Sequence, residues 1–209
     1  SNLFPGKLIL FADDNLFALR QQSRQLLKLL AEKHVRWIAQ TDISIAEDES
    51  LLKLMYQAGC QWVVIGFESV SEKSLKQIEG YAFKNKYVHH YSERIRKIQS
   101  FGIKVYGTFI VGLDEDENTI FDDTANFILK NRLYGANITV PTPLPGTVLR
   151  QTLEAENRIR SRNWGDYTLW DVVIQPKKIT VSELEGGLLH IYKRITEKNC
   201  ADERLRYIF

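Results

Sequence analysis

Carboxylate and amide side chains that could bind a ligand stand directly after the first two apolar runs of the sequence. Asp13, Asp14 and Asn15 follow the first run. Gln40 follows the second run and comes two positions before Asp42. Such oxygen groups bind hard cations such as Mg²⁺, but adjacent carboxylates rarely share one ion unless a tight turn converges them. Alternatively, Asp14 or Asn15 caps the next helix, and Gln40 and Asp42 are loop residues.

Glu68 and Ser69 follow the third apolar run, which ends at Phe67. A carboxylate at the end of an apolar strand is costly to desolvate without a partner, so Glu68 is a better site candidate than a surface glutamate. Ser69 is either part of the same site or the cap of the short helix that follows.

The fourth and fifth runs end in turns whose backbone groups suit a flat ligand. β-Branched and aromatic residues run from Lys104 to Gly112, which is typical of a strand buried on both faces. Pro143 and Leu144 lie in the proline-rich turn after the fifth run. Exposed backbone donors and acceptors in such turns can pair with the edge of a purine. Alternatively, Gly112 only makes a turn and Glu115 only lies in the first turn of a helix.

These candidates fall at the junctions between strands and helices of a predicted α/β fold. Five apolar runs alternate with helical patterns without a hairpin signal, which predicts a parallel sheet, open or curled. Ligands bind outside the carboxyl ends of parallel strands, so the candidates should share one edge. The predicted strands are 7–11, 35–39, 62–66, the run from 104 to Gly112, and 135–140. The predicted helices are 16–33, 49–58, 71–78, 87–101, 118–131, 147–156 and 181–197, with a loop at 81–86.

The alternation stops after Glu156, which predicts a main unit over residues 1–157 and a C-terminal appendage over 158–209. We interpret the basic run that begins at Arg158 as a solvated segment rather than a phosphate site. Within the appendage, Trp170–Ile174 is predicted to be an edge strand.

Composition excludes several classes of function. The chain has 209 residues and a net charge of +2, too small to argue for nucleic acid or an anionic membrane surface as a partner. No apolar segment approaches the about 20 residues that a spanning helix needs, and cytosol is the expected compartment. Neither a Ser/His/Asp or Cys/His nucleophile arrangement nor a phosphate-binding glycine loop is apparent, so no catalytic residue is predicted.

The two cysteines, Cys60 and Cys200, are too few for a disulfide framework or a cysteine-only metal site. Cys60 is predicted to be a small buried apolar residue. The first two residues, Ser-Asn, look like a processing scar, and we expect the chain to begin partway through a longer protein.

Taken in order, six pieces of the sequence resemble the radical S-adenosylmethionine (SAM) superfamily. The closest likeness is to the branch that often carries an N-terminal cobalamin-binding domain and includes tetrapyrrole cyclases of the anaerobic Mg-protoporphyrin monomethyl ester type. The likeness covers about residues 7–190. The pieces are Phe11-Ala12-Asp13-Asp14-Asn15, Ile43-Ser44-Ile45-Ala46, Ala58-Gly59-Cys60, Ile65-Gly66-Phe67-Glu68-Ser69, Phe109-Ile110-Val111-Gly112-Leu113-Asp114 and Thr142-Pro143-Leu144-Pro145-Gly146-Thr147.

The resemblance implies a (β/α)6 partial TIM-like barrel, of which this chain supplies strands two to six. It implies that Asp13 to Asn15 approach the methionyl end of SAM and that Gln40 contacts its polar groups. Glu68, beside Ser69, would lie near the ribose or the amino-acid part.

The same resemblance implies that Ile110, Gly112 and Glu115 form the Ile-x-Gly-x-x-Glu turn beside adenine. Thr108 stands where that motif usually opens with glycine. The turn at Pro143 and Leu144 would add backbone contacts.

The resemblance also implies what this chain lacks. The family holds a [4Fe–4S] cluster with a Cys-x3-Cys-x2-Cys loop after its first strand, and this sequence has no such loop. We therefore expect a C-terminal fragment of a SAM-cleaving enzyme, inactive alone, whose parent acts on a hydrophobic substrate such as a tetrapyrrole and admits cobalamin as a further cofactor. The missing N-terminal part would expose an edge of the sheet, through which two copies could also dimerise.

Two alternatives remain open from the residues. The first is an Mg²⁺-dependent α/β enzyme that uses Asp13, Asp14 and Glu68 as oxygen ligands. The second is a non-catalytic binding module.

Overall fold

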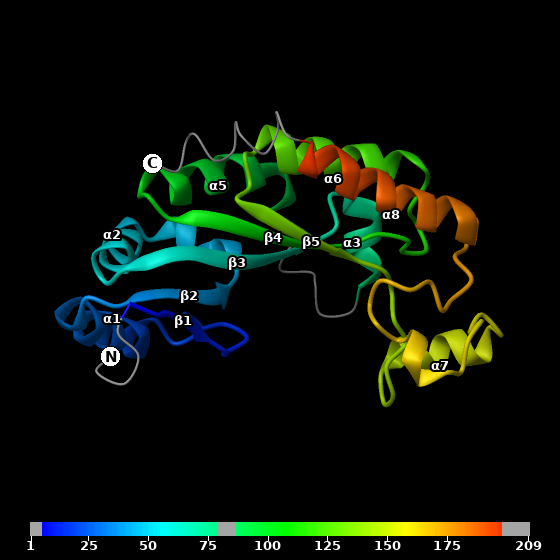
Figure 1. The fold of residues 1–209 in the computed structure, drawn as a ribbon, viewed down its shortest axis with the longest axis horizontal. Coiled ribbons are helices and arrows are strands. Elements are labelled where there is room, and N and C mark those ends of the chain that lie inside the picture. Colours follow the sequence, from blue (N-terminus) through cyan, green and yellow to red (C-terminus); the bar gives the residue numbers. More distant parts are fainter. Residues whose placement is uncertain (1–5, 79–86, 198–209) are drawn as a thin grey trace.

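Five parallel strands form one sheet in the computed structural model, which describes residues 6–78 and 87–197. The strands follow one another across the sheet in chain order. Each connection is therefore a crossover that leads from the carboxyl end of one strand back to the amino end of the next (Figure 1). The predicted parallel α/β sheet is confirmed. The strands are β1 (Leu8–Phe11), β2 (Arg36–Thr41), β3 (Cys60–Glu68), β4 (Lys104–Ile110) and β5 (Gly135–Thr139).

The crossover helices lie where the helical patterns predict them, and the predicted loop at 81–86 lies outside the described residues. Helices α5, α6 and α8 run along one side of the sheet (Figure 1). The α-helices are α1 (Arg20–Lys33), α2 (Glu49–Gln57), α3 (Glu72–Gln77), α5 (Tyr91–Ser100), α6 (Thr119–Lys130), α7 (Val148–Ala155) and α8 (Val181–Thr196). Three 3₁₀-helices are η1 (Ile43–Glu47), η2 (Val88–His90) and η3 (Trp164–Asp166).

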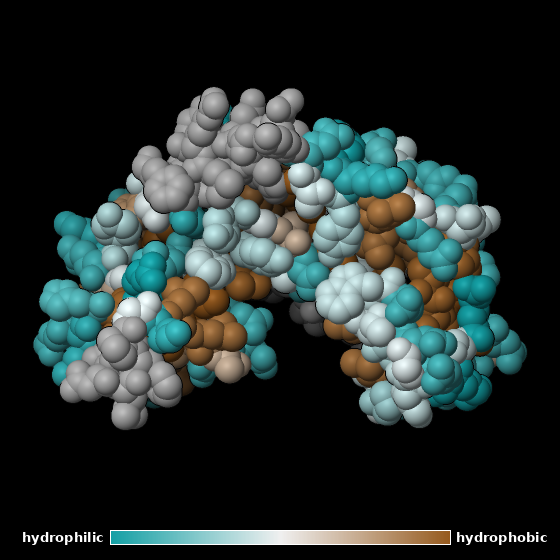
Figure 2. Space-filling model, in the orientation of Figure 1, coloured by the Kyte–Doolittle hydropathy of each residue, from teal (hydrophilic) through white to brown (hydrophobic). Residues whose placement is uncertain are grey.

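The sheet buries one face more completely than the other. Along β3 and β4 buried residues alternate with half-buried ones, so Ile65, Phe67 and Phe109 enter the core while Val64 and Thr108 face the opposite side. The core is one continuous cluster that joins the sheet to its helices. The space-filling view shows the whole as an arch with a hollow beneath it (Figure 2).

The start of α1 differs from the prediction, which began this helix at Leu16. The helix begins at Arg20 because the preceding residues form a turn against β2. In that turn the Leu16 N–H donates to the Gln40 carbonyl at 3.1 Å, and Ser23 Oγ donates to the Leu16 carbonyl at 2.7 Å.

The predicted edge strand at Trp170–Ile174 is wrong. Ile174 forms only an isolated antiparallel bridge with Ile159, supported by an Arg160 N–H bond to the Val173 carbonyl at 2.8 Å. Apolar character alone suggested a strand, but the neighbouring side chains Val173 and Ile174 are needed to pack a small separate core with Leu153 of α7.

Helix α8 packs against α6 and contributes buried side chains to the main core. It opens with a capping box, in which Thr180 and Glu183 satisfy each other's backbone N–H groups. The close approach of α8 to α6 needs a glycine at position 187, because a Cβ there would lie 2.4 Å from the Phe121 ring. The division of the chain at residue 158 stays a prediction, although Leu188 of α8 belongs to the main core.

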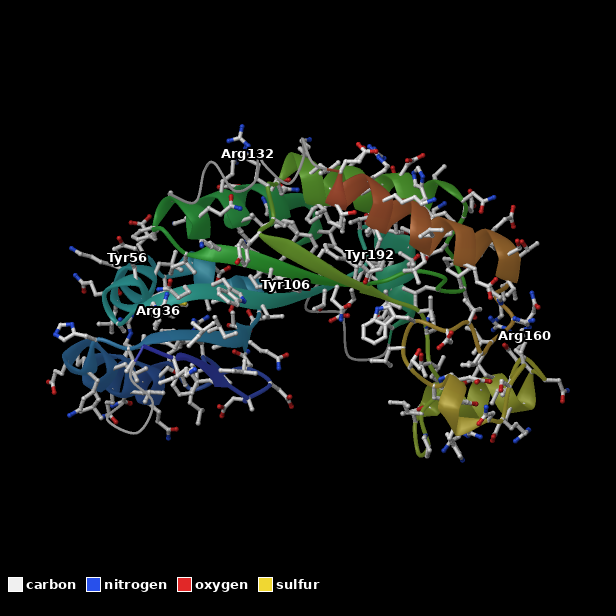
Figure 3. The ribbon with its side chains drawn as sticks, viewed as in Figure 1. Arg36, Tyr56, Tyr106, Arg132, Arg160 and Tyr192 are labelled. Carbon is white, nitrogen blue, oxygen red and sulfur yellow. The ribbon has the colours of Figure 1, made fainter. Side chains whose placement is uncertain are left out.

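Tyr192 of α8 occupies the outer edge of β5 (Figure 3). Its hydroxyl accepts from the Ile138 N–H and donates to the Ile138 carbonyl, both at 3.0 Å. Trp170 Nε1 donates to the same hydroxyl at 3.3 Å. One side chain thus satisfies the outward backbone groups of Ile138, which would otherwise lie on an unpaired edge.

None of the helices in residues 6–78 and 87–197 is long and apolar enough to cross a membrane.

We predict that Tyr192→Phe lowers the free energy of unfolding by about 1–2 kcal/mol, because the Ile138 groups lose their partner. Urea denaturation measures the change. Tyr56→Phe is the matched control, since the Tyr56 side chain is 58% exposed on α2. Equal losses in the two variants would contradict the role given to Tyr192.

Candidate functional site

A cavity of about 210 Å³ opens at the carboxyl edge of the sheet. Residues from the ends of the first four strands meet there, as the parallel sheet predicts. Three carboxylates, from Asp14, Asp42 and Glu68, contribute to its wall. The complete lining is Asp14, Asn15, Gln40, Thr41, Asp42, Val64, Gly66, Glu68 and Thr108.

Asn15 fixes the corner between β1 and β2. Its Nδ2 donates to Asp42 Oδ2 at 2.7 Å, while its Oδ1 accepts from the Phe17 N–H at 3.1 Å. Thr41 Oγ1 donates to the same Asn15 oxygen at 3.2 Å. Asn15 therefore does not cap α1, whose N-cap residue is Leu19 and makes no side-chain capping bond.

Glu68 reaches the cavity through an unusual backbone. Its φ is +63°, in the left-handed region that costs a non-glycine residue about 1 kcal/mol. The register between β3 and β4 shifts between Gly66 and Glu68, which ends the strand with an irregular step. Strain at a cavity-lining residue is typical of a site where side-chain direction matters more than stability.

Ser69 lies behind this turn rather than in the cavity wall. Its side chain is buried, and its Oγ accepts from the Ser71 N–H at 3.1 Å. Ser71 is the residue that caps α3, by accepting from the Ser74 N–H at 3.3 Å. Ser69 thus supports the turn after Glu68, and its predicted contact with a ligand stays a prediction.

Gly112 forms the turn after β4 with a φ of +92°. A Cβ at this position would lie 2.6 Å from the Leu184 side chain, so only glycine fits. The Gly112 and Leu113 N–H groups both donate to Asp116 Oδ2, at 2.9 and 3.0 Å. Sequence reasoning missed Asp116; its signal is an acidic residue four positions after a turn glycine and just before a helix.

Glu115 forms an ion pair in this structure, and its implied place in the turn beside adenine stays a prediction. Its carboxylate pairs with Lys178 at 2.7 Å. Neighbouring Asp114 accepts both terminal nitrogens of Arg158, at 2.6 and 3.1 Å, and pairs with Lys177 at 2.9 Å. The Arg158 residue is 9% exposed, so the interpretation of this position as a solvated basic residue is wrong.

The remaining predicted residues do not belong to the cavity lining. Ile110 is half-buried at the end of β4, and Asp13 is exposed beside Asp14. Pro143 is buried, and its carbonyl accepts from Arg150 Nη1 at 3.1 Å, whereas Leu144 is 44% exposed. The cavity therefore brings together Asp14, Asn15, Gln40 and Glu68 from the predicted set.

The described residues contain no group of three His, Cys, Asp or Glu side chains that could hold a metal ion. Cys60 is buried in the core, as predicted, and burial raises the pKa of its thiol far above the ordinary value. The cavity itself offers carboxylates, amides and the hydroxyls of two threonines, which can bind and orient a polar cation by charge and hydrogen bonds.

Comparison with known proteins identifies relatives of this chain. The chain matches no protein-family model. It is 26% identical over 196 residues to the bacteriochlorophyllide d C-12(1)-methyltransferase of Chlorobaculum tepidum, covering 94% of this chain and 42% of that protein. It is 27% identical over 165 residues to the anaerobic magnesium-protoporphyrin IX monomethyl ester cyclase of Cereibacter sphaeroides, covering 78% of this chain and 26% of that protein. The chain thus spans less than half the length of either relative.

Two solved structures share the fold. The radical S-adenosylmethionine methyltransferase TsrM of Kitasatospora setae, solved with cobalamin and a [4Fe–4S] cluster, superposes with a TM-score of 0.57 at 14% identity. That likeness covers 91% of this chain and 38% of TsrM. Elp3 of Methanocaldococcus infernus gives a TM-score of 0.55 at 13% identity, over 89% of this chain and 45% of Elp3.

The fold and the cavity define an α/β protein with a candidate ligand site at the carboxyl edge of its sheet. Together with these relatives, they confirm the resemblance to the radical SAM superfamily that the strand ends predict.

The ion pairs of Asp114 make a prediction about pH. Burial raises the pKa of this carboxyl, but the hydrogen bonds and charges of Arg158 and Lys177 outweigh it and lower the pKa below the ordinary value near 3.8. An acid with a lowered folded-state pKa stabilises the fold above its unfolded-state pKa, and this stabilisation is lost as pH falls through the folded-state value. We expect Asp114→Asn to cost about 1–2 kcal/mol at pH 7, discounted because the Asp114 side chain is 30% exposed.

The cost should shrink as pH falls below the ordinary carboxyl pKa, because wild type then loses the same ion pairs. Denaturant unfolding between pH 7 and pH 3 measures it. Asp123→Asn, an exposed change on α6, is the control and should show no such dependence. A cost that stays constant with pH would contradict the assignment.

Proposed function

We propose that this chain is the SAM-binding part of a radical SAM enzyme, a methyltransferase or oxidative cyclase. The observation that carries the proposal is the acid-rich cavity at the carboxyl edge, walled by Asp14, Asp42 and Glu68. SAM carries a positive sulfonium and a positive α-ammonium group, and carboxylates in a partly enclosed space attract both. Gln40 and Thr108 add neutral polar groups for the remaining ligand atoms.

The adenine end of SAM would lie toward the turn after β4. Ile110, at the end of β4, would supply apolar surface there, and Gly112 forms the turn that follows. Pro143 and Leu144 would add carbonyl oxygens from the turn after β5, since Pro143 has no N–H and the Leu144 N–H already donates to the Thr142 carbonyl at 2.9 Å. Glu115 would act at a distance from the ligand, because Lys178 already holds its carboxylate.

The residues present do not fit an iron–sulfur cluster. A cluster of this kind needs several cysteine thiolates in reach of one another. The sequence has two cysteines, and Cys60, the first residue of β3, is buried, which raises the pKa of its thiol. We propose that another part of a longer polypeptide supplies the cluster ligands, and that this chain alone does not cleave SAM.

Strand β1 is the place where such a part would join. It forms one edge of the sheet, and Leu8 and Leu10 are 41% and 60% exposed. A preceding strand that paired with β1 would complete a six-stranded partial barrel and cover these side chains. Pairing of two copies through β1 is the alternative, and sedimentation of the isolated chain separates the two, because only that pairing predicts a dimer.

The names of the relatives support a hydrophobic substrate. They include a bacteriochlorophyllide methyltransferase, a magnesium-protoporphyrin ester cyclase and a hopanoid C-2 methylase of Rhodopseudomonas palustris, the last 27% identical over 157 residues, covering 72% of this chain and 29% of that protein. We propose a substrate of this kind, such as a tetrapyrrole, and cobalamin as a further cofactor of the parent enzyme. The open face beneath the arch leaves room for a large ligand (Figure 2).

The Mg²⁺ hypothesis is less well supported. Asp13 lies outside the cavity lining, and no three described His, Cys, Asp or Glu side chains could hold a metal ion. The other two proposed ligands, Asp14 and Glu68, do line the cavity, together with Asp42 and with amide, hydroxyl and apolar groups.

We predict that the isolated chain binds S-adenosylhomocysteine, a stable analogue of SAM, and that Glu68→Gln weakens this binding about tenfold or more. Loss of one charge-assisted hydrogen bond accounts for a change of that size. Isothermal titration calorimetry measures the affinity. Glu32→Gln, on the exposed side of α1, is the matched control and should bind as wild type does.

Absence of binding in the wild-type chain, or equal affinity in the Glu68→Gln variant, would sink the proposed site. The wider proposal is tested by a longer polypeptide that includes an upstream three-cysteine loop. After anaerobic reconstitution it should show iron–sulfur absorption and release 5′-deoxyadenosine from SAM, whereas this chain should do neither.

A further inference from the structure

The carboxylate of Asp116 lies at the centre of the carboxyl edge, beneath the turn after β4. The residue is 2% exposed. Its Oδ2 accepts two backbone N–H groups, from Gly112 at 2.9 Å and from Leu113 at 3.0 Å. Its Oδ1 accepts the hydroxyl of Ser74, which is fully buried. One carboxylate thus uses both oxygens, and each oxygen holds a different segment of the chain.

The two segments are the connections that follow β3 and β4. Ser74 lies in the first turn of α3, whose N-cap residue Ser71 accepts the Ser74 N–H. The same connection begins with the strained backbone of Glu68 and continues through Ser69, which binds the Ser71 N–H. A hydrogen-bonded path therefore runs from the turn of Gly112, through Asp116, to the residues just after Glu68.

We propose that Asp116 is a positioning residue that makes the Glu68 turn and the Gly112 turn move as one rigid unit. The inference rests on the proposed function, because these turns are the ones assigned to the two ends of the adenosyl ligand. Regular pairing ends at these turns: the register shifts just before Glu68, which still pairs with Phe109, and Gly112 lies beyond the end of β4 with a left-handed φ. Past these points the side-chain bonds of Asp116 link the two turns.

The proposed role requires a hydrogen-bonding atom on both branches of the side chain at position 116 rather than a charge. All three donors are neutral, and burial raises the pKa of Asp116 even though these donors oppose the rise. An asparagine at 116 keeps one oxygen for both backbone N–H groups, and its Nδ2 can donate to the Ser74 hydroxyl. An alanine leaves both N–H groups and the hydroxyl buried without a partner.

The experiment measures amide hydrogen exchange in the 209-residue chain. We expect Asp116→Ala to raise exchange at least tenfold at Gly112 and Leu113 and also over residues 69–74. Ser74→Ala should raise exchange over 69–74 while Asp116 still holds the two turn amides. Asp116→Asn should restore near wild-type exchange in both segments.

Ser50→Ala is the matched control, because Ser50 also donates to a carboxylate, that of Asp48, at 2.8 Å outside the cavity lining. It should leave exchange in both turns unchanged. Exchange that rises in Asp116→Ala at Gly112 and Leu113 alone would overturn the coupling. If Asp116→Ala fails to fold, Ser74→Ala and Asp116→Asn decide the same question.

Binding of S-adenosylhomocysteine provides a second readout. Under conditions where every variant is folded, Asp116→Ala and Ser74→Ala should weaken binding about tenfold and about threefold, with Asp116→Asn close to wild type. A merely structural role would lower the unfolding free energy and leave the dissociation constant unchanged, and that result would overturn the proposal. If wild type binds no S-adenosylhomocysteine, the proposed function fails, and the exchange pattern alone decides the role of Asp116.

Discussion

Parallel pairing of all five strands is the constraint on which the site depends. It brings the carboxyl end of every strand to one edge, so residues 14, 40, 68 and 108 meet although they are far apart in sequence. Reversal of β3, with nine residues at about 3.3 Å each, would carry Glu68 about 30 Å to the opposite edge. No local interaction of Glu68 could compensate for that displacement. The direction of β3 therefore decides whether Glu68 can take part in the site at all.

The two edge strands of the sheet, β1 and β5, differ in whether their outward backbone groups have hydrogen-bond partners. On β5, Tyr192 satisfies the outward backbone groups of Ile138. On β1, no strand among the described residues pairs with the outer edge, and the Leu10 side chain is exposed. Because an unpaired edge is a template for another strand, β1 is the place where we propose that a further strand would join. The candidate site extends to the same side of the sheet, where Asn15 ties the loop after β1 to Asp42.

Apolar runs were sufficient to predict the strands and their parallel order, because a strand buried on one or both faces depends on local composition and on the short helical connections. They also placed Asp14, Asn15, Gln40 and Glu68 at one edge, where the cavity lies. They failed at Trp170–Ile174, where an apolar segment packs against α7 instead of pairing in the sheet. Asp116 was missed because its role depends on Ser74, 42 positions away in the sequence, and no local pattern reports such a contact.

The distribution of charge explains why the acidic turn after β4 is scaffold while the cavity can bind a ligand. Arg158 and Lys177 neutralise Asp114, and Lys178 neutralises Glu115, so the outer acids of the turn hold the C-terminal segment in place. The bonds to Asp42 come instead from Asn15 and from the Ser44 N–H, neither of which carries a charge. A carboxylate held by neutral donors keeps its negative field, and that field is what a cationic ligand would meet on entering the cavity.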